Sequence, residues 1–168
     1  MRTRRSIVGL LVCCTSWLLA AGCAARPPAI PSVPAFDTPQ WSGRLSLQVE
    51  SDPPQGFHAA FELRGNADEG ELTLYTPLGS TLALARWNGQ AALLQRGDAW
   101  HAYPDLATLS AALTGTALPL AELFEWLQGR TMPAPGWEVE LDPENGRLRA
   151  RRSEPPPPAT LRLLLDRP

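Results

Sequence analysis

The feature that most constrains this chain is a two-residue alternation of apolar and polar side chains, repeated in short segments. Within residues 41–50, Leu45, Leu47 and Val49 alternate with polar side chains. Successive side chains of a strand point to opposite faces, so this pattern predicts a strand with one buried and one solvated face. Residues 57–64 repeat the pattern with larger apolar side chains, and the Pro- and Gly-containing residues 52–56 between the two segments predict a hairpin.

Further short apolar segments follow along most of the chain, with turn residues between them, and those at 71–75, 137–142 and 147–151 show the same alternation. Together they predict strands at 71–75, 80–87, 90–95, 99–103, 137–142, 147–151 and 161–165. Asn88-Gly89, which separates two of these segments, is the strongest two-residue hairpin signal. A spacing of roughly 8 to 12 residues favours an antiparallel meander of about nine strands over βαβ units.

Two segments instead show the periodicity of a helix. Leucines recur at helical spacing in residues 106–113, between Asp105, a typical N-cap residue, and Gly115, a typical helix end. A second helix is predicted between Pro119 and Gly129. Both helices are too short to be stable alone, so we expect their apolar faces to pack on one face of a curved sheet.

The first residues predict an export signal. Three arginines precede an uncharged run over residues 6–19, and small residues lead to Cys23. This run is shorter than the roughly 20 residues that span a bilayer, so we expect residues 1–22 to be a signal peptide and the mature protein not to span the membrane.

The sequence Leu-Ala-Ala-Gly-Cys23 resembles the bacterial lipobox, in which the cysteine is acylated and becomes the mature N-terminus. The alternative is ordinary signal cleavage with an incidental cysteine, but such a thiol would have no disulfide partner in an oxidising compartment. Ala24 rather than Asp follows Cys23, which favours the outer membrane, facing the periplasm. We therefore divide the chain into residues 1–22 (signal peptide), 23–40 (acylated cysteine and Pro-rich tether) and 41–168 (folded domain).

Charge and composition exclude several functions. From Ala24 onward there are 12 arginines and 17 acidic residues, a net charge of −5, which leaves no basic face for nucleic acid. The mature chain has only two histidines, His58 and His101, expected on strand surfaces, and no cysteine after Cys23. We find no metal-ligand spacing, nucleophile elbow or phosphate loop, so we predict neither a catalytic site, nor a metal, nor a cofactor.

One turn carries an unusual residue at its tip. Pro77 fits position i+1 of a type I turn and Gly79 fits i+3, which places Leu78 at i+2 between two strands. In one interpretation Leu78 folds back on its own hairpin. In the other it is exposed and enters lipid, where its burial is worth roughly 1.5 to 3 kcal/mol.

Taken together, these residues resemble the LolB family of outer-membrane lipoprotein receptors. The resemblance covers nearly the whole mature chain and rests on Cys23 and four segments: Trp41-Ser-Gly-Arg-Leu45, Phe57-His-Ala-Ala-Phe-Glu-Leu63, Leu74-Tyr-Thr-Pro-Leu-Gly-Ser-Thr81 and Leu113–Leu120 with Leu123–Gly129. It implies an unclosed antiparallel β-barrel whose mouth is plugged by helices over an apolar cavity. It also implies a carrier that takes triacylated lipoproteins from the periplasmic carrier LolA and inserts them into the inner leaflet of the outer membrane without nucleotide.

In this reading Pro77, Leu78 and Gly79 form a membrane-insertion loop, with Leu78 protruding. The acyl-chain cavity is expected to be lined by inward-facing strand residues and by one face of each helix. These are Leu45, Leu47, Phe57, Phe61, Leu72, Leu74, Leu109, Leu113, Leu123, Phe124, Trp126, Trp137, Val139, Leu161 and Leu163. The expected partners are the LolA–lipoprotein complex, the acyl chains of its cargo and outer-membrane lipid, bound by a monomer.

Two other classes of function stay open at this point. An anchored module of the same fold would bind another lipid, lipopolysaccharide or an envelope partner protein. A hydrolase acting on ester substrates is a third hypothesis. The identity of the cargo separates the first two, and a hydrolase assay tests the third.

Overall fold

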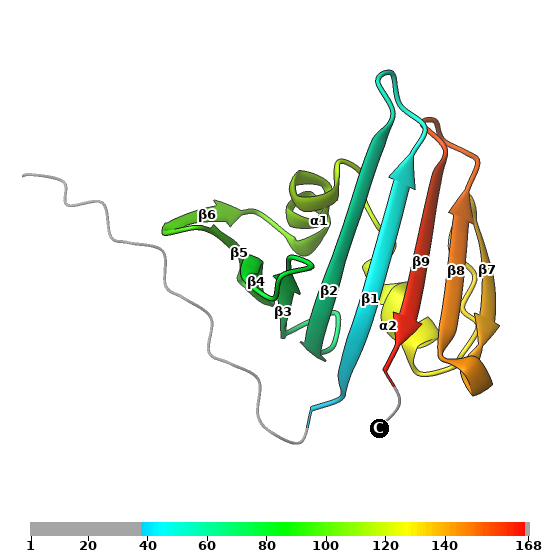
Figure 1. The fold of residues 1–168 in the computed structure, drawn as a ribbon, viewed down its shortest axis with the longest axis horizontal. Helices are drawn as coiled ribbons and strands as arrows, with labels where there is room; N and C mark the ends of the chain where they lie inside the picture. Colours follow the sequence, from blue (N-terminus) through cyan, green and yellow to red (C-terminus); the bar gives the residue numbers. More distant parts are fainter. Residues whose placement is uncertain (1–37, 167–168) are drawn as a thin grey trace, which may run out of the picture.

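The computed structural model describes residues 38–166, in which nine antiparallel strands form a single sheet (Figure 1). The strands are β1 (Gln40–Val49), β2 (Gln55–Gly65), β3 (Gly70–Tyr75), β4 (Thr81–Asn88), β5 (Ala91–Arg96), β6 (Ala99–Tyr103), β7 (Trp137–Asp142), β8 (Arg147–Arg152) and β9 (Ala159–Leu165). All nine predicted strands are present. The predicted signal peptide, Cys23 and most of the tether lie outside the described residues.

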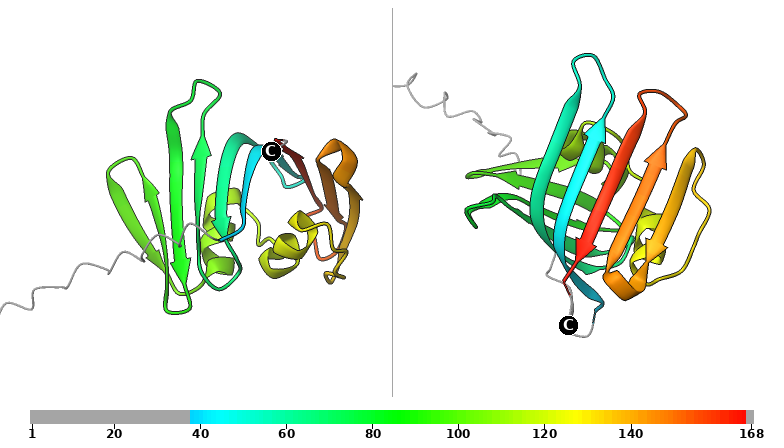
Figure 2. Two further views of the ribbon diagram at one scale, coloured as in Figure 1. Left: turned by 90° about the horizontal axis from the view of Figure 1, so that it is seen from below. Right: turned by 45° about the vertical axis from the view of Figure 1, so that its right-hand side comes forward.

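The strand order is β6-β5-β4-β3-β2-β1-β9-β8-β7. The first six strands follow one another as the predicted meander, and β9 returns to pair with both β1 and β8. Leu47 therefore lies between Phe57 on one neighbouring strand and Leu161 on the other. Within the described residues β6 and β7 do not pair with each other, so the sheet curves without closing, as Figure 2 shows, and the predicted fold class is confirmed.

The close approach of β9 to β1 depends on one glycine. Gly43 has φ +152°, and a Cβ atom there would lie 2.1 Å from the carbonyl oxygen of Leu164. Only glycine has no Cβ atom, so the Ser-Gly-Arg sequence of β1 fits this crossing where another residue would push the strands apart.

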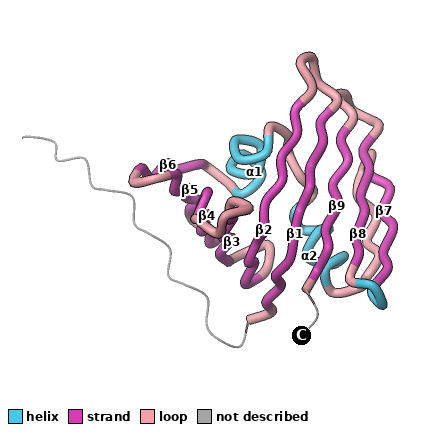
Figure 3. Tube along the Cα trace, viewed as in Figure 1, coloured by secondary structure: helices cyan, strands magenta, loops and turns pink. Residues whose placement is uncertain are grey.

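Two helices lie on the inner side of the curved sheet (Figure 3): α1 (Leu106–Thr114) and α2 (Leu120–Leu127). The carboxylate of Asp105 accepts a hydrogen bond from the Thr108 N–H at 2.6 Å, and Gly115 ends α1 with φ 79°. A short 3-10 helix, η1 (Pro143–Asn145), forms the turn between β7 and β8. None of the helices in residues 38–166 has the length and apolar character needed to cross a bilayer.

The helices are held to the sheet mainly by apolar contacts. Phe124 of α2 packs between Trp41 of β1 and Trp87 of β4, with ring centroids 5.9 and 6.3 Å apart. The Trp41 indole N–H also donates a hydrogen bond to the carbonyl oxygen of Leu127 at 3.1 Å. These contacts place the core between the sheet and the helices.

Candidate functional site

An apolar cavity of about 80 Å³ lies between α1, α2 and the inner faces of β1, β2, β3, β4 and β9. Only three of its lining side chains carry a polar atom: the indole of Trp87, whose N–H donates to the carbonyl oxygen of Asn66 at 2.9 Å, and two hydroxyls of α1. Ser110 donates to the carbonyl oxygen of Ala107 and Thr114 to that of Ser110, each at 2.8 Å. Because these hydroxyl protons are already used within the helix, the cavity offers hydrocarbon contacts and little hydrogen bonding.

Most of the residues expected to line a cavity surround this one. Twelve of the fifteen do so: Leu45, Leu47, Phe57, Phe61, Leu72, Leu74, Leu109, Leu113, Leu123, Phe124, Leu161 and Leu163. They come from four strands and two helices, so side chains with the period of a strand and side chains with the period of a helix line the same cavity.

The other three expected residues lie elsewhere. Trp126 is buried but does not line the cavity, and its indole N–H donates to the carbonyl oxygen of Met132, between α2 and β7, at 2.8 Å. Trp137 and Val139 are half-buried on β7, the edge strand, and two strands separate β7 from β1. The Trp137 ring instead lies 5.5 Å from the Arg152 guanidinium carbon. The alternation in β7 predicts which face of the sheet Trp137 and Val139 occupy, but it does not predict how far they lie from the cavity.

The cavity also has lining residues that the sequence analysis left out. These are Leu63, Ala85, Trp87, Leu106, Ser110, Thr114, Leu118, Leu120 and Leu127. Leu63, Leu120 and Leu127 extend apolar patterns that were already evident, and Trp87 follows from the alternation of β4. Leu118 lies between the helices, where no periodic signal marks it.

The loop between β3 and β4 presents Leu78 to solvent. Gly79 N–H donates to the carbonyl oxygen of Thr76 at 2.9 Å, and Thr76 N–H donates to that of Ser80 at 2.8 Å. The hydroxyls of Thr76 and Ser80 are also hydrogen-bonded to each other, at 2.8 Å. Leu78 is 96% exposed at the tip of this closed turn, so it does not fold back on its hairpin.

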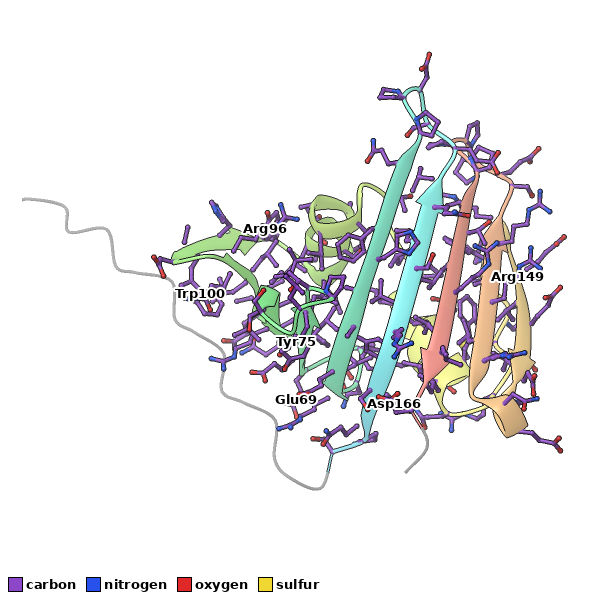
Figure 4. All side chains as sticks on the ribbon, in the orientation of Figure 1. Glu69, Tyr75, Arg96, Trp100, Arg149 and Asp166 are labelled. Atoms are coloured by element: carbon purple, nitrogen blue, oxygen red, sulfur yellow. The ribbon has the colours of Figure 1, made fainter. Side chains whose placement is uncertain are left out.

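Tyr75 lies at the base of this loop (Figure 4). Burial, followed by the negative charge of Glu62, raises the pKa of the Tyr75 phenol above its ordinary value. The phenol therefore stays neutral at physiological pH, and the base of the loop carries no charge from this side chain.

We expect Gly79→Ala to lower the free energy of unfolding by about 1–2 kcal/mol, the cost of the left-handed conformation for a residue with a Cβ atom. Gly79 has φ +84°, and no other part of the chain lies within 4 Å of the position of a Cβ, so backbone strain is the only penalty. Urea unfolding of the parent and variant measures it. Gly89→Ala, at another turn glycine with open space but without a positive φ, is the matched control and should change the midpoint little.

The described residues contain no arrangement typical of catalysis. No group of three or more His, Cys, Asp or Glu within residues 38–166 is placed to hold a metal ion. His58 and His101 are both exposed, as predicted. The features that distinguish this structure are the apolar cavity and the exposed leucine.

An unclosed antiparallel barrel with an apolar interior, covered by two helices, defines the class of open-barrel proteins suited to apolar ligands. Within that class, the chain belongs to the LolB family: the family model described as "Outer membrane lipoprotein LolB" matches residues 38–154.

Proteins named outer-membrane lipoprotein LolB are similar to this chain over most of its length. That of Chromobacterium violaceum is 39% identical over 132 residues, covering 74% of this chain and 69% of the relative. That of Azoarcus sp. (strain BH72) is 31% identical over 147 residues, covering 84% and 73%. That of Ralstonia nicotianae is 29% identical over 145 residues, covering 82% and 69%.

Proposed function

We propose that this protein is an outer-membrane lipoprotein receptor, which accepts acylated lipoproteins from the periplasmic carrier LolA and inserts them into the inner leaflet of the outer membrane. The observation that carries the proposal is the almost entirely apolar cavity, on a fold that also exposes a leucine. Membership of the LolB family supports the same role. The receptor would act as a monomer without nucleotide or cofactor.

The cavity favours hydrocarbon over any polar ligand. Burying one methylene group is worth about 0.8 kcal/mol, whereas an amide or hydroxyl loses free energy on entering an apolar space without a partner. Acyl chains therefore suit this interior. Their passage from LolA to the receptor and then to the bilayer would be driven by increasing removal of methylene surface from water.

The size of the cavity implies that the helices move when cargo binds. A volume of about 80 Å³ is smaller than the roughly 150 Å³ of an engineered apolar cavity that binds benzene, and an acyl chain is much longer than benzene. Few hydrogen bonds hold the helices to the sheet: Trp41 donates to the carbonyl of Leu127, and Arg96 donates to those of Ala112 and Leu113. We infer that α1 and α2 separate from the sheet as the chains enter, exchanging protein contacts for acyl contacts.

The anchor and domain boundaries belong to the same proposal. Residues 1–22 would be removed as a signal peptide, Cys23 would be acylated, and residues 23–40 would tether the domain 41–168 to the outer membrane on its periplasmic side. The first described strand, β1, starts at Gln40, the last residue of the proposed tether.

We expect the chain of residues 24–168, which has no acylation site, to accept a purified triacylated lipoprotein from its LolA complex. It contains every described strand, helix and core contact, so the cavity is retained. Separation of the two proteins by size and affinity tag, followed by detection of the cargo, measures the transfer. LolA without cargo is the control.

If the folded fragment accepts no cargo, the receptor proposal is wrong. Native mass spectrometry of the fragment would then identify any other lipid in the cavity, which is the result expected of an anchored lipid-binding module.

A further inference from the structure

The outer face of the sheet carries an arginine cluster beside the loop of Leu78. Arg44 of β1, Arg147 and Arg149 of β8 and Arg162 of β9 are all exposed on this face. We call these four residues the arginine face. Strand pairing brings them together, because Arg149 lies directly opposite Arg162, and Leu164 lies between Arg44 and Arg147.

The arginine face and the loop border the same groove. This groove, of about 1100 Å³, is lined by all four arginines and by Thr76, Pro77 and Gly79 of the loop. Figure 2 (left) shows the β3–β4 loop projecting on the side of the sheet opposite to the helices. Figure 4 shows Tyr75 of β3, at the base of the loop, and Arg149 of β8, with β2, β1 and β9 between them. A flat partner that reaches Leu78 therefore also faces the arginines.

Contacts within the protein use little of this positive charge. Arg162 donates to Gln48 at 3.1 Å, and Arg149 Nη1 lies 3.8 Å from the exposed carboxylate of Glu140, a pair of small energetic value. The Arg44 and Arg147 side chains have no hydrogen bond or ion pair with another residue in the part of the chain that the structure describes. Like charges directly opposite on neighbouring strands, such as Arg149 and Arg162, destabilise a sheet. Sheet stability therefore does not explain this arrangement.

The charge of the rest of the domain is opposite. Residues 38–166 contain 10 arginines and 16 acidic residues, and this groove is lined by four of the ten arginines but by only two of the sixteen acidic residues, Glu140 and Asp142. An anionic surface is therefore attracted to this face and repelled by most others.

We propose that the arginine face binds the anionic headgroups of membrane phospholipids and thereby orients the protein so that Leu78 meets the bilayer. An apolar tip flanked by basic side chains is the combination by which proteins bind a membrane surface, since the apolar group enters the acyl boundary while the cations stay among the headgroups. An acidic partner protein would match the arginines but would not explain an isolated leucine at the tip of the loop. The orientation rests on the insertion role proposed for Leu78, whereas the headgroup binding can be measured separately from any cargo.

The test is flotation of the 24–168 chain, free of cargo, with vesicles of phosphatidylcholine alone or with added phosphatidylglycerol. Binding should rise with the phosphatidylglycerol content and fall as salt is added. Arg44→Gln, Arg149→Gln and Arg162→Gln should each weaken binding to the anionic vesicles about fivefold, and the Arg149→Gln/Arg162→Gln double variant about 25-fold. Arg130→Gln removes the same charge from an exposed site outside the groove, and should bind within twofold of the parent.

Transfer of cargo from LolA in the absence of vesicles is measured on the same variants. Loss of anionic binding with normal transfer supports the proposal. Vesicle binding equal to that of the parent overturns it. So does normal vesicle binding with impaired transfer, which would assign the arginine face to an acidic protein. A parent chain that binds anionic vesicles but accepts no cargo would refute the receptor role and leave the headgroup site standing.

Discussion

Replacement of Leu78 by Glu is expected to abolish the insertion of lipoproteins into liposomes while leaving the fold and the acceptance of cargo intact. Leu78 is 96% exposed in the free protein, so the charged side chain costs the fold nothing. In the membrane the variant loses the roughly 1.5 to 3 kcal/mol gained by burying a leucine, which is at least a tenfold loss. It also acquires a carboxylate that resists leaving water.

The measurement is the cargo recovered in floated liposomes after its transfer from the LolA complex. Leu78→Ala should reduce insertion less than Leu78→Glu, because it shortens the apolar side chain without adding charge. Met132→Glu, at an apolar residue that is 44% exposed outside the loop, is the matched control and should insert cargo normally. Normal insertion by the Leu78→Glu protein would exclude the loop from the insertion step.

Phe124→Ala should lower the free energy of unfolding by about 3–5 kcal/mol, more than either Gly79→Ala or Leu82→Ala. Phe124 is buried, lines the cavity and contacts the rings of both Trp41 and Trp87. Its removal joins new empty space to the existing cavity, and a large apolar cavity of this kind stays dry and binds small hydrocarbons. We therefore expect the folded variant to gain affinity for benzene or a short fatty acid.

Urea unfolding and binding of the small apolar ligand are measured on the same preparation. Leu82→Ala, at a leucine that is 39% exposed, removes apolar surface without opening the core and should cost less than about 1 kcal/mol. A loss below that value for Phe124→Ala would mean that α2 is not packed on the sheet as described. The helix movement proposed for cargo binding would then have no contact to break.

Local patterns in the sequence predict the elements of this fold better than their arrangement. Alternation identifies strands such as β1, β2 and β8, which have one buried and one solvated face, and turn residues separate the remaining strands. The Asp105 and Gly115 signals identify the limits of α1. The position of Leu78 is predictable for the same reason, since Pro77 and Gly79 define the turn locally.

Pairing between distant segments is not encoded locally, and the remaining errors come from it. The insertion of β9 between β1 and β8 decides which inward side chains reach the cavity, so Trp137 and Val139 share the pattern of cavity residues without lining it. It also brings Arg44, Arg149 and Arg162 together, although each appears alone in the sequence as an ordinary solvent-facing arginine.

The position of β9 also determines the order in which the chain can fold. Val49 of β1 pairs with Ala159. One edge of β1 therefore has no pairing partner until a segment more than a hundred residues further along the chain is in place. Contacts this distant in sequence form slowly, because the chain loses loop-closure entropy before the contacts stabilise it. Until residues 159–165 arrive, the β7–β8 hairpin has no strand to join and β1 presents an open edge of the kind that aggregates. The chain is thus most prone to aggregate before β9 has paired with β1, and a periplasmic chaperone would protect it best by covering β1.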